Sequence, residues 1–391
     1  MEMEYFKKQV CDEIDAHQQE LNELCLEIHS NPELGFNEVK AVEWLTRYLE
    51  KNGFTIETGI YELTTAFRAS YGEGKPVIAI LAEYDALPDL GHACGHNIIA
   101  TIAIGTGIAS KLTVDKFGGS IQVIGTPAEE LYGGKVTMAS KGAFSDIDIA
   151  MMVHPATLDT AMSKSLACHT LYIEFFGKAA HASSEPEAGI NALEAMLQSF
   201  TAINSLRQHI KTTARIHGVI TNGGQAANIV PSYCAGTFIV RAEDEFYLEE
   251  LKQKVINCFV AGSLGTGAKL EYKWDDIYYA PMCNNVTLAR LFTENMKALG
   301  RNMLLSDTVS SVASTDMGNV SQLVPAIHPY VKIAEKDVMI HSPEFALAAA
   351  SGEGMKGMID SAKALSMTIV DLLATPEAVN KAKDEFVGTT K

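Results

Sequence analysis

Hydrophobic positions in the first part of the chain recur with helical spacing and then gather into short runs. Helical periodicity extends from about Lys7 to Ile28, and again from Asn37, a typical N-cap, to Gly53, a typical residue just past a helix end. Short β-rich runs follow at 77–81, 120–124 and 147–153, with helix-compatible stretches between them. This alternation predicts a mostly parallel sheet covered by helices.

A different rhythm begins near Ala167. The strand-like and helix-like runs then follow in the order strand 171–176, helix 189–210, strands 215–220 and 233–240, helix 244–260, and strand 269–274. A β-α-β-β-α-β order is typical of an open-faced α+β sandwich with two helices on one face. A segment of this length is large enough to be a domain.

Helical patterns return after Pro281, followed by a strand-like run at 324–333 and a long helix beginning near Phe345. A chain of 391 residues is long enough for two domains. We therefore predict one α/β domain built from residues 1–166 and 281–391, with a second domain, 167–280, inserted between them.

Composition narrows the class of protein. Hydrophobic residues make up 47% and charged residues 20%, as in ordinary globular proteins. No run approaches about 18 consecutive apolar residues, so we expect no membrane-spanning helix. Charged residues interrupt the first twenty positions, so we expect no secretory signal.

Charge and cysteine content indicate the partners and the compartment. A net charge of −17 repels phosphate backbones and anionic lipids, so nucleic acid and membrane surfaces are not expected partners, and a small substrate is. The seven cysteines are odd in number and irregularly spaced. This favours free thiols in a reducing compartment, and we expect the cytoplasm.

Polar residues follow three of the predicted parallel strands. Glu83 and Asp85 follow the first, Glu129 and Glu130 the second, and His154 the third. Ligands collect at the carboxyl ends of strands in open α/β sheets, so these side chains are expected to converge.

Cys94 and His96 lie between the first two of these strands, separated by a glycine that lets the backbone bend around an ion. Thiolate and imidazole ligands suit zinc or a similar transition metal, and His341 is a further candidate. A Cys-x-His triplet alone is more often structural, and a Glu-Glu pair alone is usually solvated. Their expected meeting at one sheet edge favours a metal site, because uncompensated charge there is costly.

Adjacent carboxylates have a specific use beside a metal. If one binds the ion, the other can take a proton from a metal-bound water. We favour Glu130 as the ligand and Glu129 as the base, although the residues alone also allow the reverse.

Seven segments, in order along nearly the whole chain, resemble the motif series of one enzyme family. They are 29–35 (HSNPELG), 82–88 (AEYDALP), 92–97 (HACGHN), 127–130 (PAEE), 177–182 (GKAAHA), 228–231 (NIVP) and 341–345 (HSPEF). The family is the two-metal aminoacylase and dipeptidase family of metallopeptidases (M20, subfamily D). The branch most resembled holds aminobenzoyl-glutamate hydrolases and β-alanyl-lysine-type dipeptidases.

The resemblance implies a catalytic domain, an inserted lid domain through which the chain forms a homodimer, and two divalent metal ions per subunit, zinc or manganese, sharing a bridging water. The implied metal ligands are Cys94, His96, Glu130, His154 and His341. Glu129 matches the general base, and Asp85 matches a carboxylate that orients a ligand. His181 matches a lid histidine that stabilises the oxyanion in the partner subunit's site, and Asn228 matches a lid residue near the same place.

Two residues depart from the family pattern. Glu83 stands where histidine or aspartate is usual, and Asn97 stands where aspartate often follows the triplet. Both bear on the second metal position.

Other candidates carry a weaker signal. The run 314–319 (STDMGN) either lines a substrate pocket or caps a helix. Arg241 suits a substrate carboxylate, although a surface ion pair is the more ordinary reading. His328 is interpreted as structural or as a neighbour of a ligand.

Together these features predict a metal-dependent amidohydrolase or peptidase that cleaves the amide bond of a small N-acyl amino acid or dipeptide. The alternative is a catalytically silent metal-binding regulatory or scaffold protein on the same fold. Retention of Glu129 and Glu130 beside five ligand candidates favours the enzyme.

Overall fold

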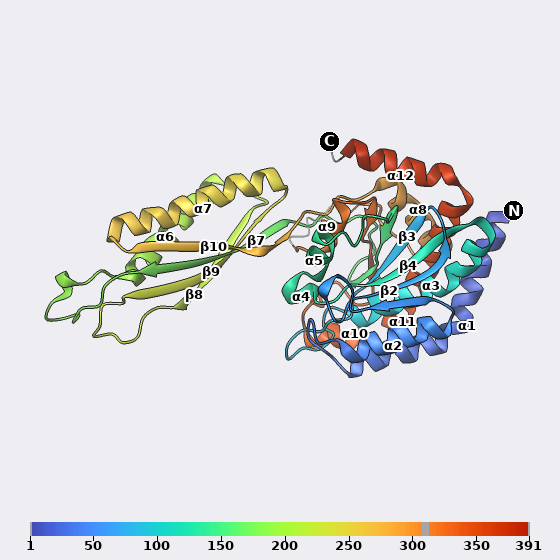
Figure 1. The fold of residues 1–391 in the computed structure, drawn as a ribbon, viewed down its shortest axis with the longest axis horizontal. Coiled ribbons are helices and arrows are strands. Elements are labelled where there is room, and N and C mark those ends of the chain that lie inside the picture. Colours follow the sequence, from blue (N-terminus) through green and yellow to red (C-terminus); the bar gives the residue numbers. More distant parts are fainter. Residues whose placement is uncertain (1, 307–312, 390–391) are drawn as a thin grey trace. The chain divides into compact units, whose positions relative to one another are not determined.

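The computed structural model describes residues 2–306 and 313–389, which form two compact units (Figure 1). Unit 1 holds the described residues within Met1–Lys164, Met282–Ser311 and Thr315–Lys391. Unit 2 holds those within Ser165–Pro281 and Val312–Ser314. Unit 1 is thus built from segments that lie on both sides of unit 2 in the sequence.

Unit 1 contains a six-stranded sheet in the order β1-β2-β4-β3-β5-β11 and a small sheet of β6 and β12. The bounds are β1 Thr55–Thr58, β2 Phe67–Glu73, β3 Val77–Ala82, β4 Gly119–Gly125, β5 Ile149–Met151, β6 His154–Ala156, β11 Ala326–Ile327 and β12 Tyr330–Lys332. Strands β4, β3, β5 and β11 run parallel, whereas β1 and β2 pair antiparallel at one edge. The carboxyl ends of the four parallel strands therefore share one edge.

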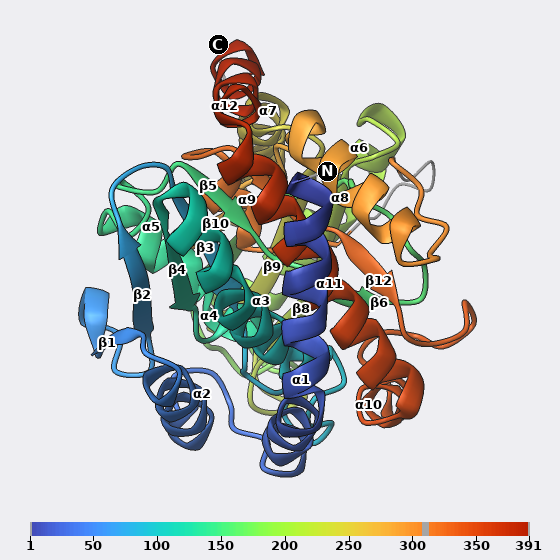
Figure 2. The ribbon, with the colours of Figure 1, turned by 90° about the vertical axis from the view of Figure 1, so that its right-hand side faces the viewer.

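Helices cover both faces of the larger sheet. Their bounds are α1 Glu2–Ser30, α2 Val39–Lys51, α3 His96–Phe117, α4 Glu129–Tyr132, α5 Gly134–Ser140, α8 Val286–Ala298, α9 Met317–Ser321, α10 Pro343–Ala348, α11 Gly352–Ala374 and α12 Pro376–Thr389. Helices α1, α3 and α11 pack against one another (Figure 2). They belong to the core on one face, and α5 and α9 belong to the core on the other.

Strand β3 shows why its sequence is a continuous apolar run. Ile78 and Ile80 belong to the core beneath α1, α3 and α11, while Val77, Ala79 and Leu81 belong to the core beneath α5 and α9. Side chains alternate between the faces of a strand, so a strand covered on both faces has no polar positions to spare.

Helix α3 passes through the middle of unit 1. Among the described residues it is the one helix long and apolar enough to cross a membrane, yet 89% of its apolar window is buried inside the protein. It does not appear as a run of consecutive apolar residues, because Thr101, Gly105 and Thr106 interrupt it. Its burial is that of a core helix.

Unit 2 has one antiparallel sheet in the order β10-β7-β9-β8. Its elements are β7 Ala167–Phe176, α6 Ala192–Leu206, β8 Arg215–Asn222, β9 Tyr233–Ala242, α7 Glu245–Thr266 and β10 Lys269–Tyr279. Leu171, Ile173 and Phe175 alternate along β7 and pack in one core with residues of α6 and α7. The predicted class, a mostly parallel α/β domain with an inserted α+β sandwich, is confirmed.

Several predicted bounds differ from those in the structure, three of them for a clear local reason. Helix α2 begins at Val39 rather than after Asn37, whose amide donates to the carbonyl of Gly35 instead of capping the helix. The expected strand 324–333 is two short strands, because the chain leaves the sheet at His328 and Pro329. The expected helix from Phe345 is two helices, and the second begins afresh with Ser351 as its N-cap.

Candidate active site

The carboxyl edge of the parallel strands carries the polar residues that the sequence singled out. Glu83 and Asp85 follow β3, Glu129 and Glu130 open α4 after β4, and His154 follows β5. Cys94 and His96 lie at the start of α3, and His341 lies in the turn before α10. All of these residues belong to unit 1.

Cys94 is the centre of the cluster. Its Sγ lies 3.4 Å from Nε2 of His154 and 3.3 Å from Nε2 of His341. Two groups of potential ligand atoms, each lying within 4.8 Å of one another, share this sulfur: Cys94 with His96 and His154, and Cys94 with Glu130 and His341. The five predicted ligand candidates are therefore brought together as two sets of three with one member in common.

The backbone around Cys94 is tightly constrained by Gly95. This residue has φ of +81°, and a Cβ on it would lie 2.5 Å from Cγ of Pro155. Only glycine combines this left-handed conformation with such a close approach. The turn directs Cys94 and His96 to the same side of the α3 N-terminus.

Asp85 connects two members of the cluster. Its Oδ1 lies 3.0 Å from Nδ1 of His96, and its Oδ2 accepts the N–H of Glu130 at 3.0 Å. Burial alone would raise the pKa of Asp85, but the charge and hydrogen bond of His96 hold it below its ordinary value. An ionised Asp85 therefore leaves Nε2 of His96 facing the cluster.

His154 is oriented by its own backbone. Its Nδ1 lies 2.6 Å from the carbonyl of Pro155, so the ring donates there and leaves the Nε2 lone pair for the cluster. Burial, followed by the charge of His96, lowers the pKa of His154 to about 4. A neutral imidazole is the form that binds metals.

His341 completes the set from near the end of the chain. Its N–H donates to the carbonyl of Ala93, and its Nε2 lies 3.3 Å from Oε1 of Glu130. Its φ of +67° is a conformation that costs a non-glycine residue energy. Such strain is typical of functional positions.

The two adjacent glutamates differ in their surroundings. Glu130 belongs to the group with Cys94 and His341, whereas Glu129 approaches a second set of carboxylates. Burial, then the neighbouring charges of Glu83 and Glu130, raise the pKa of Glu129 well above its usual value. Burial opposes ionisation of Glu130, but His341, whose Nε2 lies 3.3 Å from its Oε1, and then the charge of His96 lower its pKa below its ordinary value.

Sequence reasoning missed Lys135, which is fully buried beside the cluster. Its Nζ lies 2.5 Å from Oε1 of Glu83 and 2.8 Å from Oδ1 of Asp316. The departure at Glu83 and the run 314–319 were both visible in the sequence. A lysine after two glycines gives no local sign of burial, so only the meeting of these three segments reveals it.

His328 also lies in this region. It is buried, its ring packs edge-on against His154 and Tyr330, and neither ring nitrogen has a hydrogen-bond partner among the described residues. It follows β11, so the fourth parallel strand also ends in a polar residue at this edge.

Asn97, the second departure, is occupied elsewhere. Its amide group donates to the carbonyl of Ala349 at 3.0 Å and to Sγ of Cys25 at 3.2 Å. It therefore joins α3 to the segment before α11 and contributes no atom to the two ligand groups.

The three predicted site residues of unit 2 fall into two places. His181 is exposed and lies beside Asn228, since the N–H of Ala182 donates to the carbonyl of Asn228. Arg241 lies at the far end of β9, and its guanidinium donates to Ser314 at 3.0 Å. Asn228 comes shortly before Tyr233, the first residue of β9. The strand separates Tyr233 from Arg241 by roughly 26 Å at about 3.3 Å per residue. Unit 2 therefore does not bring Arg241 together with His181 and Asn228.

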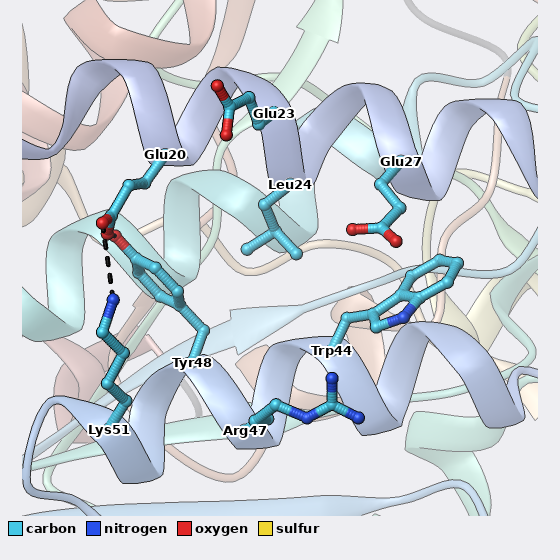
Figure 3. A pocket seen from close by; sticks show the side chains of 8 residues that line it. All are labelled: Glu20, Glu23, Leu24, Glu27, Trp44, Arg47, Tyr48 and Lys51. Atoms are coloured by element: carbon cyan, nitrogen blue, oxygen red, sulfur yellow. Dashed lines mark hydrogen bonds and ion pairs between the residues drawn. The ribbon is translucent and has the colours of Figure 1, made fainter.

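A hollow of about 250 Å³ lies outside the cluster, between α1 and α2 (Figure 3). Glu20, Glu23 and Glu27 line one side, and Trp44 and Tyr48 line the other. The hydroxyl of Tyr48 donates to Glu20, and Lys51 lies 3.4 Å from the same carboxylate. These interactions join the two helices, and none of the predicted site residues lines the hollow.

The cluster fits divalent ions by its donor chemistry and by its buried polar atoms. Nε2 of His96 and Oε1 of Glu130 are buried without a hydrogen-bond partner among the described residues. Such buried atoms normally have partners, so their convergence indicates a bound group. A thiolate, three imidazoles and a carboxylate are a ligand set for zinc or similar transition metals.

Comparisons with known proteins agree with this arrangement. Residues 168–262 match the family described as "Peptidase dimerisation domain". The chain is 36% identical to the Xaa-Arg dipeptidase of Mus musculus over 98% of this chain and 93% of that protein. It is 28% identical to one of the polypeptides of the p-aminobenzoyl-glutamate hydrolase of Escherichia coli, over 97% of this chain and 94% of that polypeptide.

Solved structures share the fold. A dinuclear metal-binding peptidase of the M20 family from Bacillus subtilis aligns over 92% of this chain and 99% of its own, with a TM-score of 0.73 and 20% identity. The aminobenzoyl-glutamate utilization protein of Klebsiella pneumoniae aligns over 93% and 98%, with a TM-score of 0.72 and 17% identity. The full-length likeness to the mouse dipeptidase exceeds what a shared fold alone would give. The chain therefore belongs to the M20 family of metallopeptidases and is an enzyme of that family.

Proposed function

We propose that the cluster in unit 1 holds two divalent ions and hydrolyses the amide bond of a dipeptide. The observation that carries this proposal is the position of Cys94, whose Sγ belongs to both groups of ligand atoms. His96 and His154 would complete one ion's ligands, and Glu130 and His341 the other's. Glu129 stands beside the cluster but outside these two sets.

The chain's own side chains supply the proton transfers. When bound, the ions lower the pKa of a water molecule and polarise the scissile carbonyl. Glu129 takes the proton of the attacking water and returns it to the leaving amine. Its group with His96 and Glu130, all within 4.8 Å, supports this role. We assign to His181, by its exposed position in unit 2, the stabilisation of the developing oxyanion in a partner subunit.

The names of the relatives support the substrate class that we propose. They include an Xaa-Arg dipeptidase and, as the name of the Escherichia coli protein states, a hydrolase of an acylated glutamate. Because identity is higher to the dipeptidase, we propose dipeptides with a basic C-terminal residue as the preferred substrates. The net charge of −17 favours a cationic ligand over an anionic one.

A substrate and metal screen tests this function. Chelated protein is reloaded separately with zinc, manganese or cobalt and assayed by release of the free amine. The panel contains Xaa-Arg and Xaa-Lys dipeptides, neutral dipeptides, an N-acyl amino acid and p-aminobenzoyl-glutamate. We expect two ions per chain and fastest turnover of the basic dipeptides. Two bound ions with no hydrolysis of any member would instead support the silent metal-binding protein.

A further inference from the structure

Lys135 is the second residue of α5, and its whole side chain is buried. Its ammonium contacts two carboxylates from separate segments, Glu83 after β3 and Asp316 before α9. The backbone N–H of Lys135 also donates to Asp316, at 2.9 Å. Asp316 therefore holds Lys135 through both its backbone N–H and its ammonium group.

A third carboxylate approaches the same place. One oxygen each of Glu83, Glu129 and Asp316 lie within 4.8 Å of one another. Carboxylates this close in a buried site repel one another when ionised, and either a cation among them or a bound proton relieves that repulsion. The ammonium of Lys135 occupies the position that a cation would take between Glu83 and Asp316.

Glu83 contacts Lys135 with one carboxylate oxygen and faces the ligand candidate His96 with the other. Its Oε1 lies on Lys135, while its Oε2 lies 3.4 Å from Nε2 of His96. Glu83 belongs to neither group that contains Cys94. A Glu83 carboxylate released from Lys135 would no longer be fixed in place and could move against Glu129.

We propose that Lys135 is a positioning residue for Glu129, acting as an internal cation that holds Glu83 and Asp316 and so fixes the carboxylate of the base. This inference rests on the role of Glu129 in the proposed function. Lys135 does not touch the reacting atoms. It fixes the carboxylates of Glu83 and Asp316, which lie close to the base, Glu129.

Stability alone is a poor reason for such a cluster. Replacing a buried ion pair with apolar groups of similar size is often neutral or stabilising, because desolvating the charges offsets their attraction. Three segments nevertheless place charged side chains, Glu83, Lys135 and Asp316, close to the predicted base Glu129. A functional reason for the cluster is therefore favoured over a structural one.

The test is a charge-balanced set of variants. Lys135→Met removes the ammonium at similar size, Lys135→Arg keeps the charge, and the double variant Glu83→Gln/Lys135→Met removes one charge of each sign. Lys383→Met is the matched control, since Lys383 pairs with Asp148 at 2.6 Å, and Asp148 lies at the opposite end of β3. Each variant is assayed for kcat, KM and metal content, and for urea unfolding after chelation.

We expect Lys135→Met to lower kcat by about 100-fold, the scale of a misplacement of about 1 Å, with KM within about threefold and metal content unchanged. The double variant should regain at least about tenfold of that loss, and Lys135→Arg should be milder than Lys135→Met. Lys383→Met should keep native kcat.

Two results would overturn the inference. One is native kcat in Lys135→Met. The other combines two measurements. If the effects of the Glu83 and Lys135 substitutions on the free energy of unfolding of chelated protein are not additive, while the double variant recovers no kcat, the pair is merely structural. If Lys135→Met does not fold, Lys135→Gln replaces it, and Glu83→Gln/Lys135→Gln must then be at least about tenfold faster than Lys135→Gln.

Failure of the proposed function is distinguishable. If Glu129→Gln keeps activity, the base assignment is wrong whatever Lys135 does. If Glu129→Gln is inactive and Lys135→Met is native, only the role of Lys135 is wrong.

Discussion

Oδ1 of Asp85 lies 3.0 Å from Nδ1 of His96, so the imidazole presents its other nitrogen to Cys94 and the cluster. The same carboxylate accepts the N–H of Glu130 through its second oxygen. One buried residue therefore orients a ligand candidate on α3 and the backbone at the start of α4.

Asp85→Asn should weaken metal binding by about 10- to 100-fold, the usual effect of losing a partner that orients a ligand. The amide oxygen can still accept from His96, but the charge is lost. Metal affinity is measured by competition with a chelating dye. Asp115→Asn is the control, because Asp115 accepts an exposed hydrogen bond from Tyr71. Equal affinities for the two variants would argue against the orienting role.

Glu129→Gln and Glu130→Gln separate base from ligand. We expect Glu129→Gln to retain both ions and lose kcat by about 10²- to 10⁴-fold, because general-base catalysis is removed. Glu130→Gln should instead lose metal, as shown by elemental analysis. The opposite pattern would assign the two roles in reverse.

Cys94→Ala should reduce binding at both ion positions, because the two groups of ligand atoms share its Sγ. Metal content after dialysis should fall from two ions to below one. Cys258→Ser is the control, since that half-buried thiol lies in α7 of unit 2. Loss of a single ion would show that the sulfur serves only one position.

Glu38 should make stability depend on pH. Burial raises its pKa to about 7, above the ordinary value of 4.5, and its Oε1 accepts the N–H of Ala128. A carboxyl whose pKa is higher in the folded than in the unfolded protein contributes most to the free energy of unfolding below pH 4.5, where it is protonated in both states. This contribution is lost as the pH rises to about 7.

Glu38→Gln removes that loss. The free energy of unfolding is measured with urea on chelated protein. Relative to the native protein, that of the variant should rise between pH 5 and pH 8 by at most about 3 kcal/mol, because each tenfold change in proton affinity corresponds to about 1.4 kcal/mol. A difference between the two proteins that does not change with pH would contradict the assignment.

His181 offers a test of assembly. If it acts in the partner's site, mixing His181→Ala with Glu129→Gln should regenerate activity as subunits exchange, since some mixed sites carry both native residues. Glu130→Gln mixed with Glu129→Gln is the control, because both residues belong to the same cluster in unit 1 and no mixed dimer then holds an intact site. Verified mixed dimers without recovered activity would show that His181 does not act across subunits.

The parallel strands explain how much of the site the sequence could predict. Residues that directly follow β3, β4 and β5 had to meet at one edge, so Asp85, Glu130 and His154 were predictable from strand order. The motif series added His341, which no local pattern connects to Cys94.

Contacts that depend on side-chain packing were not predictable. Lys135 and Asp316 are far apart in sequence, and nothing local shows that both are buried. The break in the strand at His328 did have a local signal, since Pro329 lies within the run 324–333 and cannot donate to a strand ladder. The periodicity of apolar residues predicts which side chains are buried. Only the tertiary structure shows which residues they contact.

The position of His341 has a consequence for biosynthesis. Unit 1 is interrupted by unit 2 in the chain, and strand β11 and His341 both come after that interruption. A ribosome delivers residues in order, and domains tend to fold as they emerge. The nascent chain can fold unit 2 while the first part of unit 1 still lacks its last parallel strand and its last imidazole. Assembly of the full donor set therefore waits until the residues up to His341 have been synthesised.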